Sequence, residues 1–320
     1  IGTFFNFTRS QSSTAVQPNS PEYFNSMKEF IASDLLPMLL NGEEMFGIRS
    51  NKISCIVPLN EWNSDDSLNE AMSWLNEKTA ATHINPNQKI GLLIVPFQEK
   101  SFYENIALTI ITSKEPRTTF QNILNVIGKQ NISPKIEATA IISASSKIGQ
   151  GCYIGHGVII ENDVQIGNNC IIDHHSVIKS KTIIGNNVLV GTHCCIGNNG
   201  FGYVKDNFGK FTTMPHVGIV IIEDDVIIHN HVCIDKAVIG KTRIQSGARI
   251  DNLVHIAHGV TIGKNTLVIA NSMIGGSTKI GNNCWVAPSV SINNKIEIAD
   301  GTVIGTGAVV IRNTEEGKTY

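Results

Sequence analysis

Three residues in the last third of the chain are of types that could together catalyse a transfer reaction. Asp251 precedes His258 by seven residues, and Gly276 follows His258 by eighteen. An aspartate can fix the tautomer of an imidazole and stabilise its protonated form, which leaves the other ring nitrogen as a general base. A glycine leaves its backbone N–H open to a developing oxyanion. The three types therefore favour a catalytic site, provided that the fold brings them together.

The element that must position these residues repeats every six residues, from about Ile136 to Val310. Ile or Val opens most hexads, Gly often follows, and the fifth place is small or β-branched. A period of six fits neither an amphipathic helix nor a half-buried strand, and it is typical of a parallel β-helix. We predict a left-handed parallel β-helix with the first residue of each hexad inside. Gly, Asn or Asp at the second place and Asn or Gly at the fourth would suit the corners, where positive φ is easier for these types.

The repeat converts sequence spacing into distance. Three hexads close a triangular coil of about eighteen residues, and neighbouring coils stack about 4.8 Å apart. We therefore expect Gly276 directly above His258, with Asp251 on the same wall. The alternative is that His258 is only a polar turn residue, because corners of this repeat favour Asn, Asp and His.

Histidines could instead hold a metal ion. Carbonic anhydrases of this fold use a histidine pair four residues apart and a third histidine one coil away. The close pairs here are adjacent, two apart or three apart, so we expect no metal site. The histidines considered are His174, His175, His193, His216, His229, His231, His255 and His258.

The chain outside the repeat has a different pattern. We predict a polar N-terminal arm over residues 1–18, a small α/β domain over 19–131, the β-helix over 132–312 and a C-terminal tail over 313–320. Within the α/β domain, apolar spacing predicts helices from residue 21 to about 36, over 67–78 and over 116–128, and strands at 53–57 and 91–95.

One long interruption breaks the hexads at residues 198–217. It is rich in aromatic residues, and an insertion of this length cannot fit inside a coil, so we predict an external loop. Because long loops in compact folds are usually functional or disordered and the aromatic content argues against disorder, we expect it to contact substrate or a neighbouring subunit. The alternative is a loop that only packs on its own coil.

Composition and charge narrow the function. The net charge is −2 and the pI about 6.6, which argues against a nucleic-acid partner. The seven cysteines lack Cys-x-x-Cys spacing, so we expect buried, reduced thiols. No signal peptide opens the sequence and no apolar run reaches the roughly 20 residues of a membrane span, so we expect a cytoplasmic protein with no transmembrane segment.

Four short segments are similar to one known family. They are Asn199-Gly200-Phe201-Gly202-Tyr203, Ile234-Asp235-Lys236, Ile250-Asp251-Asn252 and Ile256-Ala257-His258. With the segment 116–124, these motifs and their separations resemble those of UDP-3-O-acylglucosamine N-acyltransferases, enzymes of lipid A biosynthesis, over residues 110–320.

The resemblance implies an activity and a role for each residue of the set. His258 would remove a proton from the 2-amino group of a UDP-linked glucosamine, Asp251 would orient His258, and the Gly276 amide would hold the oxyanion. The amine would attack the thioester of a 3-hydroxyacyl chain on acyl carrier protein, with no cofactor beyond this donor, at clefts between the subunits of a homotrimer. The residues implied for substrate binding are Phe201, Tyr203, Asp235, Asn252, His255 and Lys295.

Three departures from the family favour alternatives. Lys295 stands where the family often has a second histidine, residues 53–60 lack the aromatics of its uracil clamp, and the sequence ends at Tyr320 where relatives continue into C-terminal helices. One alternative is an N-acyltransferase that takes acetyl- or acyl-CoA and another nucleotide amino sugar. Another is a non-catalytic, trimeric protein that binds a sugar nucleotide.

Overall fold

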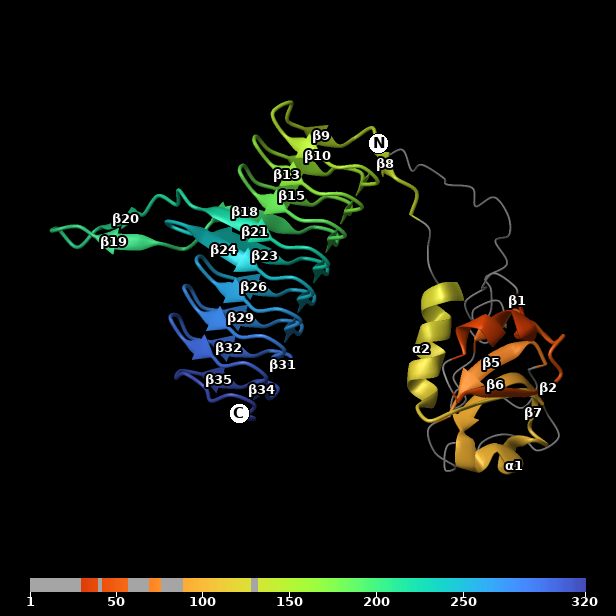
Figure 1. Cartoon of the computed structure of the whole chain (residues 1–320). Helices are drawn as coiled ribbons and strands as arrows, with labels where there is room; N and C mark the ends of the chain where they lie inside the picture. The colour runs from red at the N-terminus through yellow and green to blue at the C-terminus, as the bar shows by residue number, and fades with distance from the viewer. Residues whose placement is uncertain (1–29, 40–41, 57–68, 76–88, 128–131) are drawn as a thin grey trace, which may run out of the picture. The chain divides into compact units, whose positions relative to one another are not determined.

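The computed structural model describes residues 30–39, 42–56, 69–75, 89–127 and 132–320. The chain divides into two compact units, Ile1–Asn131 and Ile132–Tyr320, which Figure 1 shows in ribbon form. Each unit has its own core, and each is described by itself below.

The N-terminal unit is built on a five-stranded sheet of order β2-β7-β6-β5-β4 in which only the β2–β7 pair is antiparallel. Helix α2 covers one face, where Ile123 packs with Leu92 and Ile94. Tyr103 of α1 is buried against Leu93 on the other face. The elements of this unit are β1 (Phe30–Ile31), η2 (Ala32–Met38), β2 (Glu44–Gly47), β3 (Lys52–Ile53), β4 (Cys55–Ile56), β5 (Ala71–Trp74), β6 (Ile90–Pro96), η5 (Phe97–Glu99), α1 (Lys100–Tyr103), β7 (Ala107–Ser113) and α2 (Pro116–Ile127).

Two of the elements predicted for this unit are confirmed and others are corrected. The strand predicted at 91–95 is β6, and the helix predicted at 116–128 is α2, with residue 128 outside the described residues. The helix predicted over 67–78 is wrong, because Ala71–Trp74 form β5 between β4 and β6. The strand β5 is hydrogen-bonded to a neighbour on each side, and its first three residues are buried. These tertiary interactions decide its structure, although its apolar residues have helical spacing.

The start of the unit also differs from expectation. Phe30–Ile31 form a strand and Ala32–Met38 a 3₁₀ helix, where one continuous helix from residue 21 was predicted. The strand predicted at 53–57 is divided at Ser54 between β3 and β4. The predicted arm at 1–18 and the remaining parts of the predicted helices lie outside the described residues.

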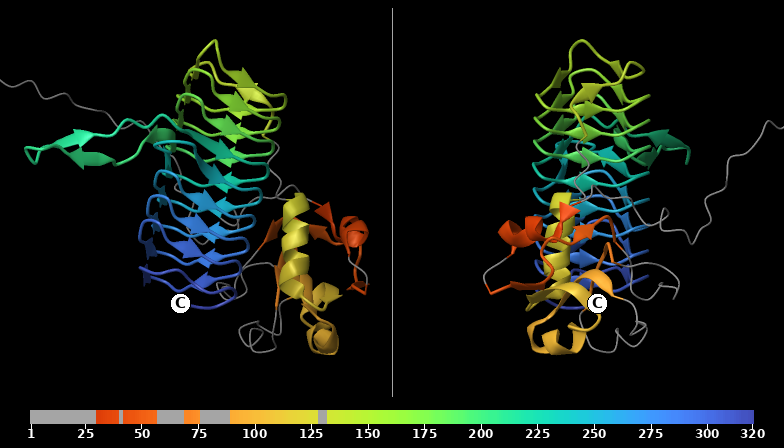
Figure 2. Two further views of the ribbon diagram at one scale, coloured as in Figure 1. Left: turned by 60° about the vertical axis from the view of Figure 1, so that its left-hand side comes forward. Right: turned by 90° about the vertical axis from the view of Figure 1, so that its right-hand side faces the viewer.

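The second unit is a parallel β-helix, as predicted, and Figure 2 shows its stacked coils from two further sides. Successive short strands enter three parallel sheets in turn, which we name after their first strands. The β8 sheet holds β8 (Lys135–Ile136), β11 (Tyr153–Ile154), β14 (Ile171–Ile172), β17 (Leu189–Val190), β22 (Ile227–Ile228), β25 (Arg249–Ile250), β28 (Leu267–Val268), β31 (Trp285–Val286) and β34 (Val303–Ile304).

The β9 sheet holds β9 (Ile141–Ile142), β12 (Ile159–Ile160), β15 (Val177–Ile178), β18 (Cys195–Asn199), β23 (Cys233–Lys236), β26 (His255–Ile256), β29 (Met273–Ile274), β32 (Ser291–Ile292) and β35 (Val309–Val310). The β10 sheet holds β10 (Lys147–Ile148), β13 (Gln165–Ile166), β16 (Ile183–Ile184), β21 (Ile219–Ile222), β24 (Lys241–Ile244), β27 (Thr261–Ile262), β30 (Lys279–Ile280) and β33 (Glu297–Ile298). The turns that join these sheets form the β8/β9 corner and the β9/β10 corner.

The inside of each coil is filled by two residues per hexad, those at the first and fifth places, such as Ile154 and Val158. Strand pairs stack in register, so that Ile154 lies beside Ile172 and Ile172 beside Val190. These three side chains have no exposed surface and belong to one continuous apolar core. Because side chains alternate across a strand, the residue before each of them points outward.

The corners follow the predicted rule at the fourth place of the hexad but not at the second. Fourth-place residues such as His175 and Ser277 have φ near +60°, and the N–H of Ser277 donates to the carbonyl of His258 at 2.8 Å. Second-place glycines such as Gly263 do not have positive φ, with the exception of Gly197 next to the projecting loop of residues 198–217. A Cβ on Gly263 would lie 2.2 Å from the carbonyl oxygen of Gly281, so the close approach of the next coil requires a glycine there.

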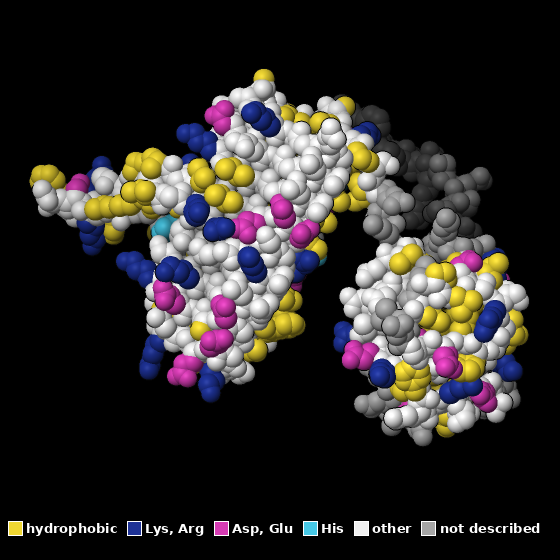
Figure 3. All heavy atoms as spheres, in the orientation of Figure 1, with side chains coloured by type: hydrophobic (Ala, Val, Ile, Leu, Met, Phe, Trp, Pro, Cys, Tyr) yellow, Lys and Arg dark blue, Asp and Glu magenta, His cyan; other side chains and the backbone are white. Residues whose placement is uncertain are grey.

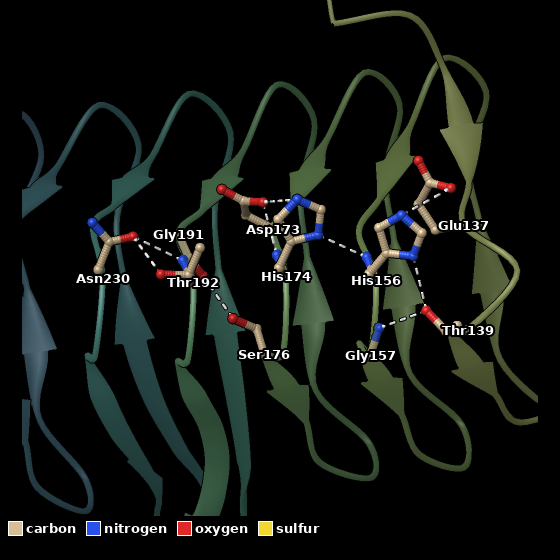
Figure 4. Close-up of polar contacts among 10 residues, drawn as sticks. All are labelled: Glu137, Thr139, His156, Gly157, Asp173, His174, Ser176, Gly191, Thr192 and Asn230. Carbon is tan, nitrogen blue, oxygen red and sulfur yellow. Dashed lines mark hydrogen bonds and ion pairs between the residues drawn. The ribbon is translucent and has the colours of Figure 1, made fainter. Parts of the chain in front are cut away.

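Polar side chains at the β8/β9 corner tie each coil to the next, as Figure 4 shows. The N–H of His156 donates to Nδ1 of His174 at 2.8 Å, and the N–H of Thr192 donates to Oδ1 of Asn230 at 2.9 Å. Histidine therefore serves this corner as a hydrogen-bonding turn residue. On the fourth place of the same corner three exposed imidazoles stack, with ring centroids 5.1 Å apart, at His175, His193 and His231.

The external loop predicted at 198–217 leaves the β9/β10 corner and projects from the coils (Figure 1). Its strands β19 (Tyr203–Lys205) and β20 (Phe211–Thr213) form an antiparallel hairpin. Hydrophobic side chains gather along it in Figure 3, and Phe208 is 96% exposed. We call residues 198–217 the projecting loop.

The last residues belong to the β-helix and do not form a separate tail. The N–H of Gly305 donates to the carbonyl of Tyr320 at 2.7 Å, and the N–H of Val303 donates to that of Lys318 at 2.9 Å. The segment thus covers β34 at the end of its sheet. Among the described residues, no helix has the length and apolar character needed to cross a bilayer.

Candidate active site

His258 and Gly276 lie together at the β9/β10 corner, as their spacing predicts. His258 follows β26 and Gly276 follows β29, the next strand of the same sheet. A Cβ on Gly276 would lie 2.7 Å from Nε2 of His258, closer than any real Cβ contact. The amide N–H of Gly276 has no hydrogen-bond acceptor among the described residues. A glycine is therefore needed for the imidazole to occupy this space.

A second imidazole, from the returning end of the projecting loop, meets the first. The rings of His216 and His258 approach edge to face with centroids 5.4 Å apart. Nδ1 of His216 lies 2.9 Å from the carbonyl of Met214, and because a carbonyl only accepts, this nitrogen carries the proton. In neutral His216, Nε2 is then an acceptor.

Two ring nitrogens at this corner are buried and have no hydrogen-bond partner among the described residues. They are Nε2 of His216 and Nδ1 of His258. A Cβ built on Gly200 would lie 3.0 Å from each of them, so both face the same small space beside the Gly200 backbone. Buried polar atoms in native proteins usually have partners, and unpaired ones commonly mark functional sites.

A buried carboxylate lies beside His255, within electrostatic reach of His216. Asp235, at the end of β23, is 5% exposed, and its Oδ2 is 3.6 Å from Nε2 of His255. Burial raises the pKa of Asp235, while the neighbouring His255 and His216 lower it in part. The sequence resemblance had implied only substrate binding for Asp235 and His255. The structure places His255 within the electrostatic surroundings of His258, and Asp235 within those of His255 and His216.

The environment favours the neutral form of His258. Burial lowers the pKa of His258, and repulsion from His216 and His255 lowers it further. A histidine with a lowered pKa remains unprotonated at neutral pH and can accept a proton from a substrate. The chemistry that this corner can perform is therefore general base catalysis next to an unpaired backbone N–H.

Asp251 does not share a wall with His258, and this part of the prediction is wrong for the single chain. Asp251 and His258 are seven residues apart, which is about one hexad and therefore one corner of the coil. Asp251 follows β25 and lies at the β8/β9 corner, whereas His258 follows β26 at the other end of that strand. Its carboxylate accepts hydrogen bonds from the N–H groups of Asn252 at 2.7 Å and Ala270 at 3.2 Å. Asn252 stays at that corner, where its Oδ1 accepts from the N–H of Asn230 at 3.0 Å.

The remaining predicted site residues lie around the β9/β10 corner. Lys295 occupies the fourth place of its hexad, its N–H donates to the carbonyl of Gly276 at 2.9 Å, and its side chain is exposed. Phe201 and Tyr203 lie at the base of the projecting loop with ring centroids 4.7 Å apart, and Phe201 is 85% exposed. These aromatics offer an apolar surface next to the histidines.

Sequence reasoning did not place His216 in the site. The projecting loop breaks the six-residue register, so spacing no longer predicts which coil position its last residues occupy. A signal was nevertheless present, because Gly200 and Gly202 both pack against the His216 ring and a side chain at either place would crowd it. Small residues at the start of a loop indicate that its other end returns close by.

A metal-ligand cluster or the cavity of the N-terminal unit would be the other possible locations of a site. Within the described part of the chain, no group of three or more His, Cys, Asp or Glu side chains is arranged to hold a metal ion. The N-terminal unit has a cavity of about 310 Å³, where the hydroxyls of Ser113 and Thr119 donate to the carboxylate of Glu43. The lining of this cavity contains two carboxylates, Glu43 and Glu115, and one cation, Lys114. This net negative charge disfavours binding of nucleotide phosphates.

Comparisons with known proteins agree with the repeat and with the resemblance. The profile of the bacterial transferase hexapeptide (six repeats) matches residues 163–198 and 277–312. The UDP-3-O-acylglucosamine N-acyltransferase of Methylacidiphilum infernorum is 44% identical over 201 residues, which cover 57% of each chain. The protein of that name from Wolinella succinogenes is 47% identical over 88 residues, 28% of each chain. The chain thus spans little more than half the length of the first of these relatives.

Solved structures with a similar fold include two acyltransferases. UDP-N-acetylglucosamine acyltransferase from Campylobacter jejuni aligns with a TM-score of 0.52 at 23% identity, covering 57% of this chain and 69% of that one. LpxA from Acinetobacter baumannii aligns with a TM-score of 0.51 at 23% identity, covering 57% and 68%. At these identities the alignments support the β-helical fold. The sequence comparisons add that this chain is similar to UDP-3-O-acylglucosamine N-acyltransferases over the matched region.

Proposed function

We propose that this protein is an N-acyltransferase that moves a 3-hydroxyacyl group from a thioester to the 2-amino group of a UDP-linked glucosamine, with His258 as the general base. The observation that carries the proposal is the pairing of a neutral, partly buried imidazole with the unpaired N–H of Gly276 one coil away. The names of the sequence relatives support this choice of substrate class.

The reaction uses the two groups in sequence. Nε2 of His258 accepts a proton from the neutral sugar amine as its nitrogen attacks the thioester carbonyl carbon. The carbonyl oxygen becomes an oxyanion, which the Gly276 N–H stabilises. When the tetrahedral intermediate collapses, the C–S bond breaks and the thiolate takes the proton from the His258 imidazolium. The products are the amide and the free thiol, and the imidazole returns to its neutral form.

His216 is the residue that holds His258 in the required tautomer. Because Nδ1 of His216 donates to Met214, its Nε2 lone pair points at the space shared with Nδ1 of His258. A proton on Nδ1 of His258 is directed at this lone pair, directly or through one water. Nε2 of His258 is then the unprotonated nitrogen, on the side of Gly276.

We further propose the partners and the assembly that the family resemblance implies. The acceptor is a UDP-sugar, the donor is acyl carrier protein or a CoA thioester, no cofactor takes part, and the working assembly is a homotrimer in the cytoplasm. Outward side chains of the β8 sheet are largely apolar, whereas those of the β10 sheet include Lys147, Arg243, Lys279 and Glu297. The apolar face and the exposed aromatics of the projecting loop suit contact with another copy of the chain.

The test is direct transfer with purified protein. UDP-3-O-(3-hydroxyacyl)glucosamine is incubated with the 3-hydroxyacyl group on acyl carrier protein or on CoA, and the amide product is measured by mass spectrometry. We expect product with wild-type protein and loss of at least about 100-fold with His258→Ala. Wild-type protein that binds the sugar nucleotide but forms no amide from either donor would leave a binding protein as the correct description.

A further inference from the structure

Two cysteines lie side by side on the outer face of the β9 sheet. Cys195 in β18 pairs in register with Cys233 in β23, the next strand of the sheet. The residues that follow them, Ile196 and Ile234, are fully buried in the core, so both thiols point outward. Both cysteines are partly exposed, and neither takes part in a disulfide.

The spacing of the two residues suits a covalent bond. Neighbouring strands of a sheet lie about 4.8 Å apart, and disulfides join Cα atoms that are about 4.4–6.8 Å apart. Each thiol affects the pKa of the other, as expected for side chains on neighbouring strands of one sheet face. A bond between them needs rotation of side chains but no separation of strands.

The surroundings give the two thiols different reactivity. The neighbouring Cys233 thiol lowers the pKa of Cys195 to about 7 in spite of burial, and Lys179 lowers it further, while Asp235 and Glu161 act in the opposite direction. The neighbouring Cys195 raises the pKa of Cys233, and burial adds to the rise. Cys195 therefore loses its proton more readily than Cys233 and is the more nucleophilic thiol of the pair.

The cysteines at the coil corners have the opposite character. Cys170, Cys194 and Cys284 are buried, and burial raises the pKa of each thiol, that of Cys170 to about 11. Their sulfurs donate to backbone carbonyls of the next coil, for example Cys170 to Gly185 at 3.0 Å. The expectation that all cysteines are buried thiols holds for the corners but is wrong for the outward pair.

We propose that Cys195 and Cys233 form a peroxide-reactive dithiol that closes to an intrachain disulfide. The Cys195 thiolate attacks one oxygen of hydrogen peroxide, the O–O bond breaks, and a sulfenic acid and hydroxide form. The Cys233 sulfur then attacks the Cys195 sulfur, which expels a second hydroxide, and the Cys233 proton and a solvent proton complete two waters. Two thiols are oxidised and one peroxide is reduced.

This site borders the proposed active site. Beyond the cysteines the two strands continue to pair, Asn198 with Asp235 and Asn199 with Lys236, before the projecting loop begins. His255 follows Cys233 in the same outward column of the β9 sheet. The modification itself does not depend on the proposed acyl transfer, and it is tested without an activity assay.

The experiment treats the full chain, folded and reduced, with hydrogen peroxide and then blocks the remaining thiols with N-ethylmaleimide. Wild-type protein is expected to lose two hydrogens in intact mass, with a peptide pair joined through Cys195 and Cys233 that dithiothreitol separates. Cys233→Ser is expected to stop at the sulfenic acid of Cys195, which dimedone traps. Cys195→Ser is expected to react with peroxide at least about tenfold more slowly.

Cys284→Ser is the matched control, because it removes a buried corner thiol and leaves the outward pair intact. It is expected to form the disulfide at the wild-type rate. The proposal would be overturned by a disulfide between two chains or by a bond to another cysteine. It would also be overturned if Cys195→Ser reacted with peroxide as fast as the wild-type protein. Circular dichroism of each variant before oxidation checks that the coils are intact.

Discussion

Two corners of the same β-helix carry histidines, and they use them in opposite ways. At the β8/β9 corner, His175, His193 and His231 are exposed and stacked, and His174 accepts a backbone hydrogen bond. At the β9/β10 corner, His216 and His258 each hold a buried nitrogen without a partner. The residue type and the repeat are shared, so neither of them distinguishes a structural histidine from a chemical one.

The difference comes from what lies beyond the corner. The β8/β9 corner continues directly into the next hexad, and water reaches its side chains. The β9/β10 corner is covered by the root of the projecting loop, which brings Gly200 and His216 against His258. Burying a ring nitrogen that has no hydrogen-bond partner costs free energy. The coils could fold without this burial, so it indicates a function other than stability. Four substitutions test this comparison.

The largest effect is expected from removing the covered imidazole. His258→Ala is expected to lower kcat/KM for acyl transfer by about 10²- to 10⁴-fold, because the general base is lost. His193→Ala removes an exposed imidazole from the other corner and is expected to change the rate by less than about twofold. Steady-state kinetics of both purified variants measure this, and equal losses in the two would show that the corners do not differ.

The next effect is expected from filling the space above that imidazole. A Cβ at Gly276 would lie 2.7 Å from Nε2 of His258 and must displace the ring. Gly276→Ala is expected to lower kcat by about 10²-fold, as misplacement of a catalytic group by about 1 Å can do. The matched change Gly305→Ala, where the added Cβ would lie 3.2 Å from the carbonyl oxygen of Tyr320, is expected to leave kcat unchanged. A Gly276→Ala variant with normal kcat would exclude a role for this close approach.

A smaller effect with a characteristic pH signature is expected from His216→Ala. Burial and His216 both hold the pKa of His258 below its ordinary value, so the base stays unprotonated to lower pH. Without His216, the pKa of His258 rises, and the acidic limb of the pH profile of kcat/KM moves to higher pH. We expect about a tenfold loss at pH 6.5. Protonation of His258 accounts for up to about twofold of it, and loss of the acceptor that fixes the His258 tautomer accounts for the rest.

The control for this profile is His229→Ala, which removes an exposed imidazole at the β8/β9 corner. Its acidic limb is expected to coincide with that of wild type. An unshifted limb in His216→Ala would contradict the assigned electrostatic role of His216, even if the rate fell.

The smallest effect on catalysis is expected at Asp251. Asp251→Asn exchanges one carboxylate oxygen for an NH₂ group, which cannot accept the hydrogen bond from the N–H of Ala270. We expect a loss of about 1 kcal/mol, seen as a melting temperature lower by about 2–4 °C, with less than about a threefold change in kcat. A loss of kcat as large as that of His258→Ala would mean that Asp251 reaches His258 from another copy of the chain.

The two units of the chain also differ in how well the sequence predicts them. In the β-helix, strands, coil stacking and buried first places follow from the six-residue period, because each hexad repeats the same local solution many times. In the N-terminal unit, Ala71–Trp74 have helical spacing but form a central strand. There each element occurs once, and its type depends on neighbours that are distant in sequence.

The sequence by itself determined the parallel β-helix, the stacking of Gly276 on His258 and the position of the projecting loop. These features depend on spacing within a regular repeat, which converts residue number into distance. Only the tertiary structure decided that Asp251 lies at another corner, that His216 joins His258, and that Cys195 meets Cys233 on an outer face. The physical reason is that the inserted loop breaks the repeat at this corner, and burial by a returning segment is a property of the folded chain.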